Sequence, residues 1–273
     1  MVTIKDYNKI AVKAAKAVII ELAHLLGEYR ENMVLVGGWV PEFIFAEKIK
    51  PHCGSIDVDI ALNHRKLQKA GYKSLQELLV NRGYELENHF TYCRLVKIDN
   101  QEIKVKVDLL AGEYGGTEKT ELNQKMQGIE ARKSRGADLA IDMYQEVRIS
   151  GELPGGGRDS VTIRVASIVP FLVMKGMALE GRLKEKDSWD IYYCLKNYPG
   201  GLDALVESFR PYLDHRLIKE GLHLIGENFA SEKDVGPKFI ADFEEISDPE
   251  ERELVQRDAY ERVNYILSRL GIV

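Results

Sequence analysis

The apolar residues of this 273-residue chain change their spacing near Ser167, and this change limits the folds that the chain can adopt. Before Ser167, several segments alternate apolar and polar residues, as strands with one buried face do. After it, apolar residues recur three or four positions apart, which is typical of packed helices. The sequence therefore predicts an α+β protein, with an α/β domain over residues 1–166 (a mixed sheet with flanking helices) and a helical domain over residues 167–273.

Single elements can be placed from the same periodicities and from capping residues. Residues 111–160 are the least regular part, where glycines separate short apolar stretches such as Asp138–Ile141 that suggest short strands and turns. Gly155–Gly157 precede a strand, which favours a hairpin tip over a phosphate-binding loop. The other expected elements are helices at about 6–29, 39–48, 74–82, 167–181, 187–196, 202–214, 216–227, 236–245 and 249–270, and strands at 33–36, 56–62, 84–87, 90–98 and 102–110.

Composition restricts the partners and the location. Charged residues make up 30% of the chain, but the net charge is −5, so no global positive field attracts nucleic acid or an anionic membrane. The three cysteines are scattered, which fits a reducing cytoplasm and disfavours a disulfide framework or a cysteine metal site. We expect no signal peptide and no membrane span, because charges interrupt the apolar runs.

One predicted strand, Ile56–Leu62, carries two aspartates on its polar face. Side chains two positions apart share a face of a strand, so Asp57 and Asp59 would lie side by side. Their charges repel unless a cation lies between them or one carboxyl is protonated. Mg²⁺ commonly uses one or two carboxylates together with substrate phosphates. The alternative is a strand end with two solvated acids.

A later strand repeats this arrangement. In the predicted strand at 102–110, Val107 and Leu109 face one way and Asp108 faces the other. Three carboxylates on neighbouring strands of one sheet would make a site for one or two metal ions.

Two glycines, Gly37 and Gly38, follow the predicted strand at 33–36 and precede a predicted helix. Backbone N–H groups at such a turn can bind phosphate. Two glycines also suit any tight strand-to-helix turn, so both interpretations stay open.

The order of these features resembles the polymerase-beta-type nucleotidyltransferase superfamily. In the second half, Lys175, Ala178 and Arg182 form a Lys-x-x-Ala-x-x-x-Arg motif, and Lys186-Asp187 with Asp190 form Lys-Asp-x-x-Asp. Together with Gly37-Gly38, Ser55 to Asp59 and Asp108, these motifs narrow the resemblance to the AbiEii/AbiGii toxin-type nucleotidyltransferases, and the likeness covers about residues 34–195.

For the first half, the resemblance implies a metal site that holds Mg²⁺ or Mn²⁺. Asp57 and Asp59 would hold the ion on the triphosphate, and Asp108 would complete a second metal site and help to deprotonate the attacking hydroxyl. The nucleotide would also contact Gly37, Gly38 and Ser55.

For the second half, the resemblance implies that Lys175 meets the triphosphate as a point charge, although a lysine at this position could also be an ordinary surface residue. Arg182 and Asp190 would belong to the nucleotide site, and we expect them to form an ion pair that fixes two helices. Asp187 is either a helix-start acid or a proton acceptor.

The implied function is transfer of an NMP from an NTP to a hydroxyl acceptor, as the toxin of a toxin–antitoxin system that acts on tRNA or another RNA, with a cognate antitoxin as partner. Two alternatives stay open: a nucleotidyltransferase that modifies an antibiotic, and a non-catalytic binding module. An RNA substrate would need a local basic patch, for which the candidates are Lys104, Lys106, Lys125, Arg132, Lys133 and Arg135.

Overall fold

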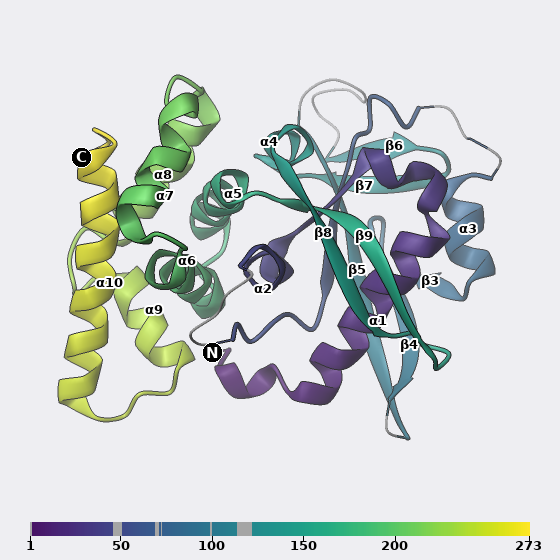
Figure 1. Ribbon diagram of the computed structural model, residues 1–273, viewed down its shortest axis with the longest axis horizontal. Helices are drawn as coiled ribbons and strands as arrows, with labels where there is room; N and C mark the ends of the chain where they lie inside the picture. Colours follow the sequence, from purple (N-terminus) through teal and green to yellow (C-terminus); the bar gives the residue numbers. More distant parts are fainter. Residues whose placement is uncertain (1, 46–50, 69–70, 72, 99, 114–121) are drawn as a thin grey trace. The chain divides into compact units, whose positions relative to one another are not determined.

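The computed structural model describes residues 2–45, 51–68, 71, 73–98, 100–113 and 122–273 (Figure 1). The chain divides into two compact units. Tyr7–Ile44 and Gly54–Ser167 form the sheet unit, and Met1–Asp6, Phe45–Cys53 and Ile168–Val273 form the helical unit. The change of period near Ser167 thus falls at the junction of the units, whereas two N-terminal segments that the sequence assigns to the first domain belong to the second.

The sheet unit is built on one mixed sheet, as predicted (Figure 1). The pairs β1–β9, β2–β5 and β5–β7 are parallel, and the other pairs are antiparallel. The strand order is β3 (Tyr84–Leu86), β4 (Thr91–Ile98), β5 (Gln101–Ala111), β2 (Val58–Leu62), β1 (Met33–Val36), β9 (Arg158–Ala166) and β8 (Tyr144–Glu152), while β6 (Asn123–Met126) pairs with β7 (Ile129–Lys133), which pairs with β5.

Helix α1 (Lys9–Leu25) packs against β4, β5, β8 and β9. It begins where Asn8 accepts a hydrogen bond from the Ala11 amide, and its buried face is made of alanine and branched aliphatic residues. The buried acid Glu21 on that face accepts bonds from Tyr84 (2.9 Å) and Arg94 (3.0 Å), so its charge is compensated. The remaining helical segments of this unit are η2 (Gly27–Asn32), η3 (Gly37–Trp39), α2 (Val40–Ile44), α3 (Leu75–Asn81) and α4 (Ala137–Asp142).

Two predictions about local structure are wrong. The strand predicted from Ile56 begins only at Val58. On one side, β1 ends at Val36, opposite Asp59, and the chain then turns at Gly37 with φ of 70°; on the other side, the pairing with β5 begins at Val58 and Val107. The apolar stretch Asp138–Ile141 lies in helix α4, and short apolar runs of this kind cannot be assigned by period alone.

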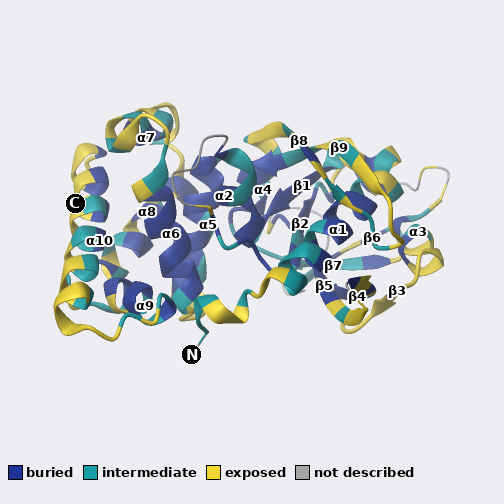
Figure 2. Cartoon of the chain, turned by 60° about the horizontal axis from the view of Figure 1, so that its bottom comes forward, coloured by how far each residue is buried: buried dark blue, intermediate teal, exposed yellow. Residues whose placement is uncertain are grey.

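The long hairpin of β8 and β9 ends in Gly155–Gly157, as the sequence indicates. Gly156 and Gly157 have φ values of 86° and 81°, which suit a tight turn, and Figure 2 shows an exposed tip on this hairpin.

The helical unit contains helices close to those predicted. They are η1 (Ile4–Asp6), α5 (Ile168–Gly181), α6 (Glu185–Asn197), α7 (Gly201–Phe209), η4 (Arg210–Tyr212), α8 (Arg216–Asn228), α9 (Val235–Phe243) and α10 (Pro249–Arg269). Helices α5 and α8 make backbone contact: a Cβ atom added at Gly176 would lie 2.2 Å from the Gly221 carbonyl oxygen. None of the helices in the described part of the chain is long and apolar enough to cross a membrane.

Candidate functional site

The site of the sheet unit begins with a pair of acids on adjacent strands. Asp59 of β2 is the register partner of Asp108 of β5 in a parallel pair. Partners in such a pair point to the same face, on strands about 4.8 Å apart. Both residues are partly exposed, and their strand neighbours Val58 and Val107 are fully buried on the other face. Two of the three predicted carboxylates are therefore brought together.

Thr91, which sequence reasoning missed, positions one of these acids. Its hydroxyl donates a 2.6 Å hydrogen bond to Asp108 Oδ1 from the neighbouring strand β4. Thr91 is 4% exposed, so the Asp108 carboxylate is held by a buried hydroxyl group. The sequence contained a signal for Thr91. In the β4–β5 hairpin Ile98 pairs with Gln101, and following the antiparallel register back from this pair places Thr91 opposite Asp108.

Gly37 lies directly against the other acid. It follows β1 with φ of 70°, and a Cβ atom at this position would lie 2.0 Å from Asp59 Oδ2. Only glycine fits both the backbone conformation and this approach. Gly37 thus leaves room for the Asp59 carboxylate beside the turn, while contact of its backbone with phosphate stays a prediction.

We expect Gly37→Ala to lower the free energy of unfolding by more than the cost of positive φ alone, which is about 1–2 kcal/mol, because Asp59 must also move. The matched control is Gly156→Ala, where φ is 86° and nothing lies within 4 Å of the added Cβ. Urea unfolding of both variants measures the difference. Equal losses would contradict the close contact between Gly37 and Asp59.

The remaining predicted residues of the sheet unit surround this pair. Asp57 lies in the bend before β2, and its carbonyl oxygen accepts a 3.0 Å bond from Trp39 Nε1. This bond replaces the strand pairing that the sequence predicted for Asp57. Gly38 is buried in η3, and Ser55 is 8% exposed just before the bend.

In the described ranges, His, Cys, Asp and Glu side chains nowhere form a group of three or more that could hold a metal ion. The three-carboxylate site of Asp57, Asp59 and Asp108 therefore stays a prediction. The pair of Asp59 and Asp108 still suits an ion such as Mg²⁺, which takes one or two protein carboxylates and fills its other positions with phosphate oxygens and water.

The predicted residues of the second half form a separate charged cluster inside the helical unit. Lys175 of α5 is 7% exposed, and its Nζ lies 2.5 Å from Asp187 Oδ1 and 2.7 Å from Asp190 Oδ2. Lys186 Nζ and His52 Nε2 also contact Asp190 Oδ1, at 2.7 and 2.9 Å. His52 and Lys186 were not predicted as site residues, and no sequence signal links His52 to α6.

The ion pair predicted between Arg182 and Asp190 is corrected by this cluster. Arg182 Nε lies 3.1 Å from Asp187 Oδ2, while Asp190 is fully buried among Lys175, Lys186 and His52. The Arg182 side chain is 48% exposed, whereas Asp190 is buried and already paired with two ammonium groups, which explains the difference. Asp187 is therefore more than a helix-start acid, since it links Arg182 to Lys175.

The charges in this cluster hold each other ionised. Burial alone would lower the pKa of Lys175, but the Asp187 and Asp190 carboxylates raise it well above its ordinary value. Burial would also raise the pKa of Asp190, yet the Lys175 and Lys186 ammonium groups keep it far below its usual range. The Lys175 ammonium is thus shared by two carboxylates, which supports a role in positioning α5 and α6.

His52 predicts a pH dependence of stability. Burial, followed by the charge of Lys186, lowers its pKa to about 4, although Asp190 opposes this shift. Between pH 6.5 and 4 the unfolded chain binds a proton that the folded chain does not, so stability falls as the pH falls. We expect His52 to contribute about 2–3 kcal/mol to the loss between pH 7.5 and 4.5.

Urea unfolding of the wild type and of His52→Gln at both pH values measures this contribution. The variant should lose less stability on acidification than the wild type. An unchanged pH dependence in His52→Gln would show that His52 is not held neutral by the fold.

Comparison with known proteins adds little to this geometry. The chain matches no protein-family model and no curated protein. Among solved structures it is similar to a crystal structure described as that of a "putative nucleotidyltransferase from H. pylori". The identity is 15%, the alignment covers 94% of this chain and 96% of that chain, and the TM-score is 0.36. A likeness this distant assigns neither a family nor an activity, so the candidate site rests on its own residues.

Proposed function

We propose that this chain is a metal-dependent nucleotidyltransferase that moves an NMP from an NTP to a hydroxyl acceptor. The observation that carries the proposal is the register of Asp59 with Asp108, next to a glycine turn that leaves space at Asp59. Two carboxylates on one sheet face, beside backbone N–H groups, provide both of the contacts that a metal-bound triphosphate needs. The sequence resemblance to AbiEii/AbiGii-type proteins points to the same chemistry.

Each site residue of the sheet unit has a role in this proposed activity. Asp59 and Asp108 hold the Mg²⁺ or Mn²⁺ ion, which neutralises phosphate charge when bound. Asp57 is the candidate for a further ligand, and Thr91 orients the Asp108 carboxylate through its 2.6 Å bond. Asp108 is the candidate to accept the proton of the attacking hydroxyl. The backbone at Gly37 and Gly38 contacts the phosphates, with Ser55 beside them.

In the helical unit, Asp187 and Asp190 hold the Lys175 side chain in position. Arg182 joins the same network through Asp187. Contact between Lys175 and the triphosphate stays a prediction, and it would require the ammonium to exchange one of its carboxylate partners for phosphate.

For the acceptor we propose an RNA such as tRNA, in the manner of a toxin with a cognate antitoxin, in a reducing compartment such as the cytoplasm. The basic patch that would bind RNA has few uncompensated charges among its candidates, because Lys104 and Lys106 are both paired with Glu87, at 3.1 and 3.5 Å. Arg132 lies over the Phe90 ring at 5.2 Å, an arrangement that could also stack a base. An antibiotic as acceptor and a non-catalytic module are the alternatives.

The test is incubation with each α-labelled NTP, Mg²⁺ or Mn²⁺, and total RNA, with a parallel reaction that contains hydroxyl-bearing antibiotics. We expect label in RNA that disappears when EDTA is added. Label in an antibiotic would replace the RNA acceptor but keep the chemistry. Absence of transfer from all four NTPs, together with no calorimetric binding of Mn²⁺-NTP, would leave the non-catalytic module.

A further inference from the structure

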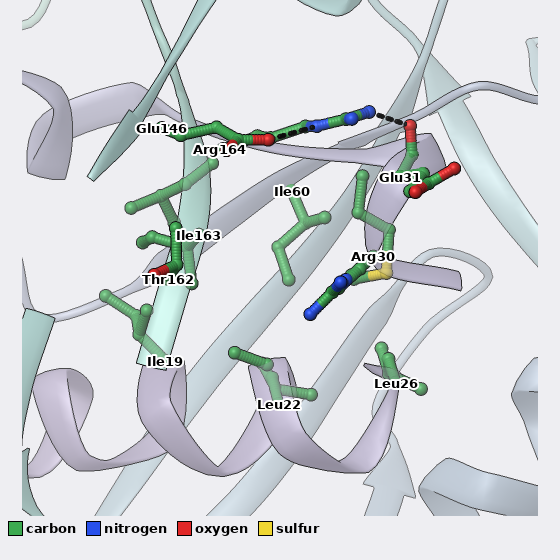
Figure 3. Close-up of a pocket in the computed structure, with 13 residues that line it drawn as sticks. Ile19, Leu22, Leu26, Arg30, Glu31, Ile60, Glu146, Thr162, Ile163 and Arg164 are labelled. Carbon is green, nitrogen blue, oxygen red and sulfur yellow. Dashed lines mark hydrogen bonds and ion pairs between the residues drawn. The ribbon is translucent and has the colours of Figure 1, made fainter. Parts of the chain in front are cut away.

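A cavity of about 330 Å³ lies within the sheet unit, between α1 and the sheet (Figure 3). Its inner wall is apolar, with Leu22 and Leu26 from α1, Leu35 from β1, Ile60 from β2 and Ile163 from β9, while polar and charged residues line the rest. The volume is near the lower end of the range for small-molecule pockets, so it excludes a long lipid. Two arginines line the cavity, Arg30 and Arg164, and Arg164 is paired within the protein, so the lining does not offer the several cations that a polyphosphate needs.

Charged residues gather at the edge of this cavity, and two of them compensate each other. Arg164 Nε lies 3.5 Å from Glu146 Oε1, and an Arg164 N–H donates to the Glu31 carbonyl oxygen (Figure 3). Arg164 also lies over the Tyr144 ring, at 4.4 Å. Its guanidinium is therefore engaged by the protein itself.

Arg30 is different. Across the described residues, its guanidinium has no hydrogen-bond or ion-pair partner. In Figure 3 the Arg30 guanidinium extends over the cavity toward Leu22, whereas the Glu31 carboxylate points away from it. An arginine in this position can bind a carboxylate through two parallel N–H donors. The cavity thus combines an apolar interior with one uncommitted cation at its edge.

We propose that this cavity binds a small monocarboxylic acid with an apolar body, of the medium-chain fatty acid class. The hydrocarbon part fills the space among Leu22, Leu35 and Ile60, and the carboxylate pairs with Arg30. The site is separate from the acidic pair, because Ile60 and Asp59 are consecutive residues of β2 and point to opposite faces. Binding here does not depend on the proposed transferase activity.

Calorimetric titration of the full chain, without nucleotide or metal, with decanoate, decanol and decylamine tests this proposal. We expect saturable binding of decanoate and binding of decanol that is about tenfold to a hundredfold weaker, because decanol lacks the charge-assisted bond. Decylamine, with the wrong charge, should bind at least as weakly as decanol. Equal binding of all three would overturn the role of Arg30, and no binding of any would overturn the site.

Variants separate the two parts of the proposal. Arg30→Ala should reduce decanoate affinity to that of decanol, and since Arg30 is exposed the fold should persist. The matched control is Arg158→Ala, an exposed arginine on β9 outside the lining, which should leave decanoate binding unchanged. Ala23→Phe, which fills the cavity, should remove binding of decanoate and decanol alike. Decanoate affinity that survives both Arg30→Ala and Ala23→Phe would place the ligand elsewhere.

Discussion

Asp59→Asn and Asp108→Asn are each expected to lower nucleotide transfer on the order of a thousandfold while leaving the fold intact. Either change removes a charge that the metal ion needs, and a metal ion contributes several kcal/mol to transition-state stabilisation. Stability should be unchanged or slightly higher, because the two carboxylates are register partners on one face and repel each other. In Asp108→Asn, the amide oxygen can still accept the Thr91 bond.

The measurements are transfer of label from NTP, calorimetric binding of Mn²⁺, and thermal melts. Asp142→Asn, an exposed acid at the end of α4, is the matched control and should retain activity and metal binding. A variant of either paired acid that keeps full Mn²⁺ binding and transfer would exclude the proposed site, whatever the chain is later found to modify.

Asp190→Asn is expected to lower the stability of the helical unit by about 3–5 kcal/mol, the cost of breaking a buried ion pair from one side. Asp190 is 0% exposed and lies within 3 Å of both Lys175 and Lys186. The substitution leaves Lys186 buried without its carboxylate, and Lys175 with Asp187 alone. An amide replaces only part of the lost interaction, because it carries no charge.

Hydrogen exchange resolves this loss by segment, which matters because the chain has two compact units. Amides of α5 and α6 should exchange faster in Asp190→Asn, whereas β2 and β5 should change little. Glu253→Gln, an exposed acid on α10, is the control and should leave α5 and α6 unchanged. If Asp190→Asn matched that control, the cluster would contribute no net stability.

The acidic pair could be predicted because strand alternation is a local property. The parity of Asp59 and Asp108 within their strands follows from period-two patterning alone. That β2 lies beside β5 in parallel, with these two acids in register, is set by long-range pairing. The sequence also could not show that the pairing of β1 with β2 ends at Val36, opposite Asp59.

The helical half illustrates the opposite case. Helix positions were predictable, because apolar spacing and caps repeat along the chain, but the partners of the charged residues were not. The fold surrounds Lys175 with two carboxylates that follow it by 12 and 15 residues, and its predicted contact with phosphate gives no sign of them. The ion-pair partners of charged residues on buried helix faces depend on how the helices pack, and the spacing of residues along one helix does not specify that packing.

The contact of Gly176 with Gly221 has a consequence for Lys175, its neighbour in α5. With no side chain between the two backbones, α5 cannot slide along α8 without driving its own peptide groups into those of α8, since a Cβ atom at Gly221 would already lie 2.8 Å from the Val173 carbonyl oxygen. The axial position of α5 is therefore decided by main-chain shape. This contact therefore limits where Lys175 can lie along α8, in addition to the ion pairs that link α5 to α6.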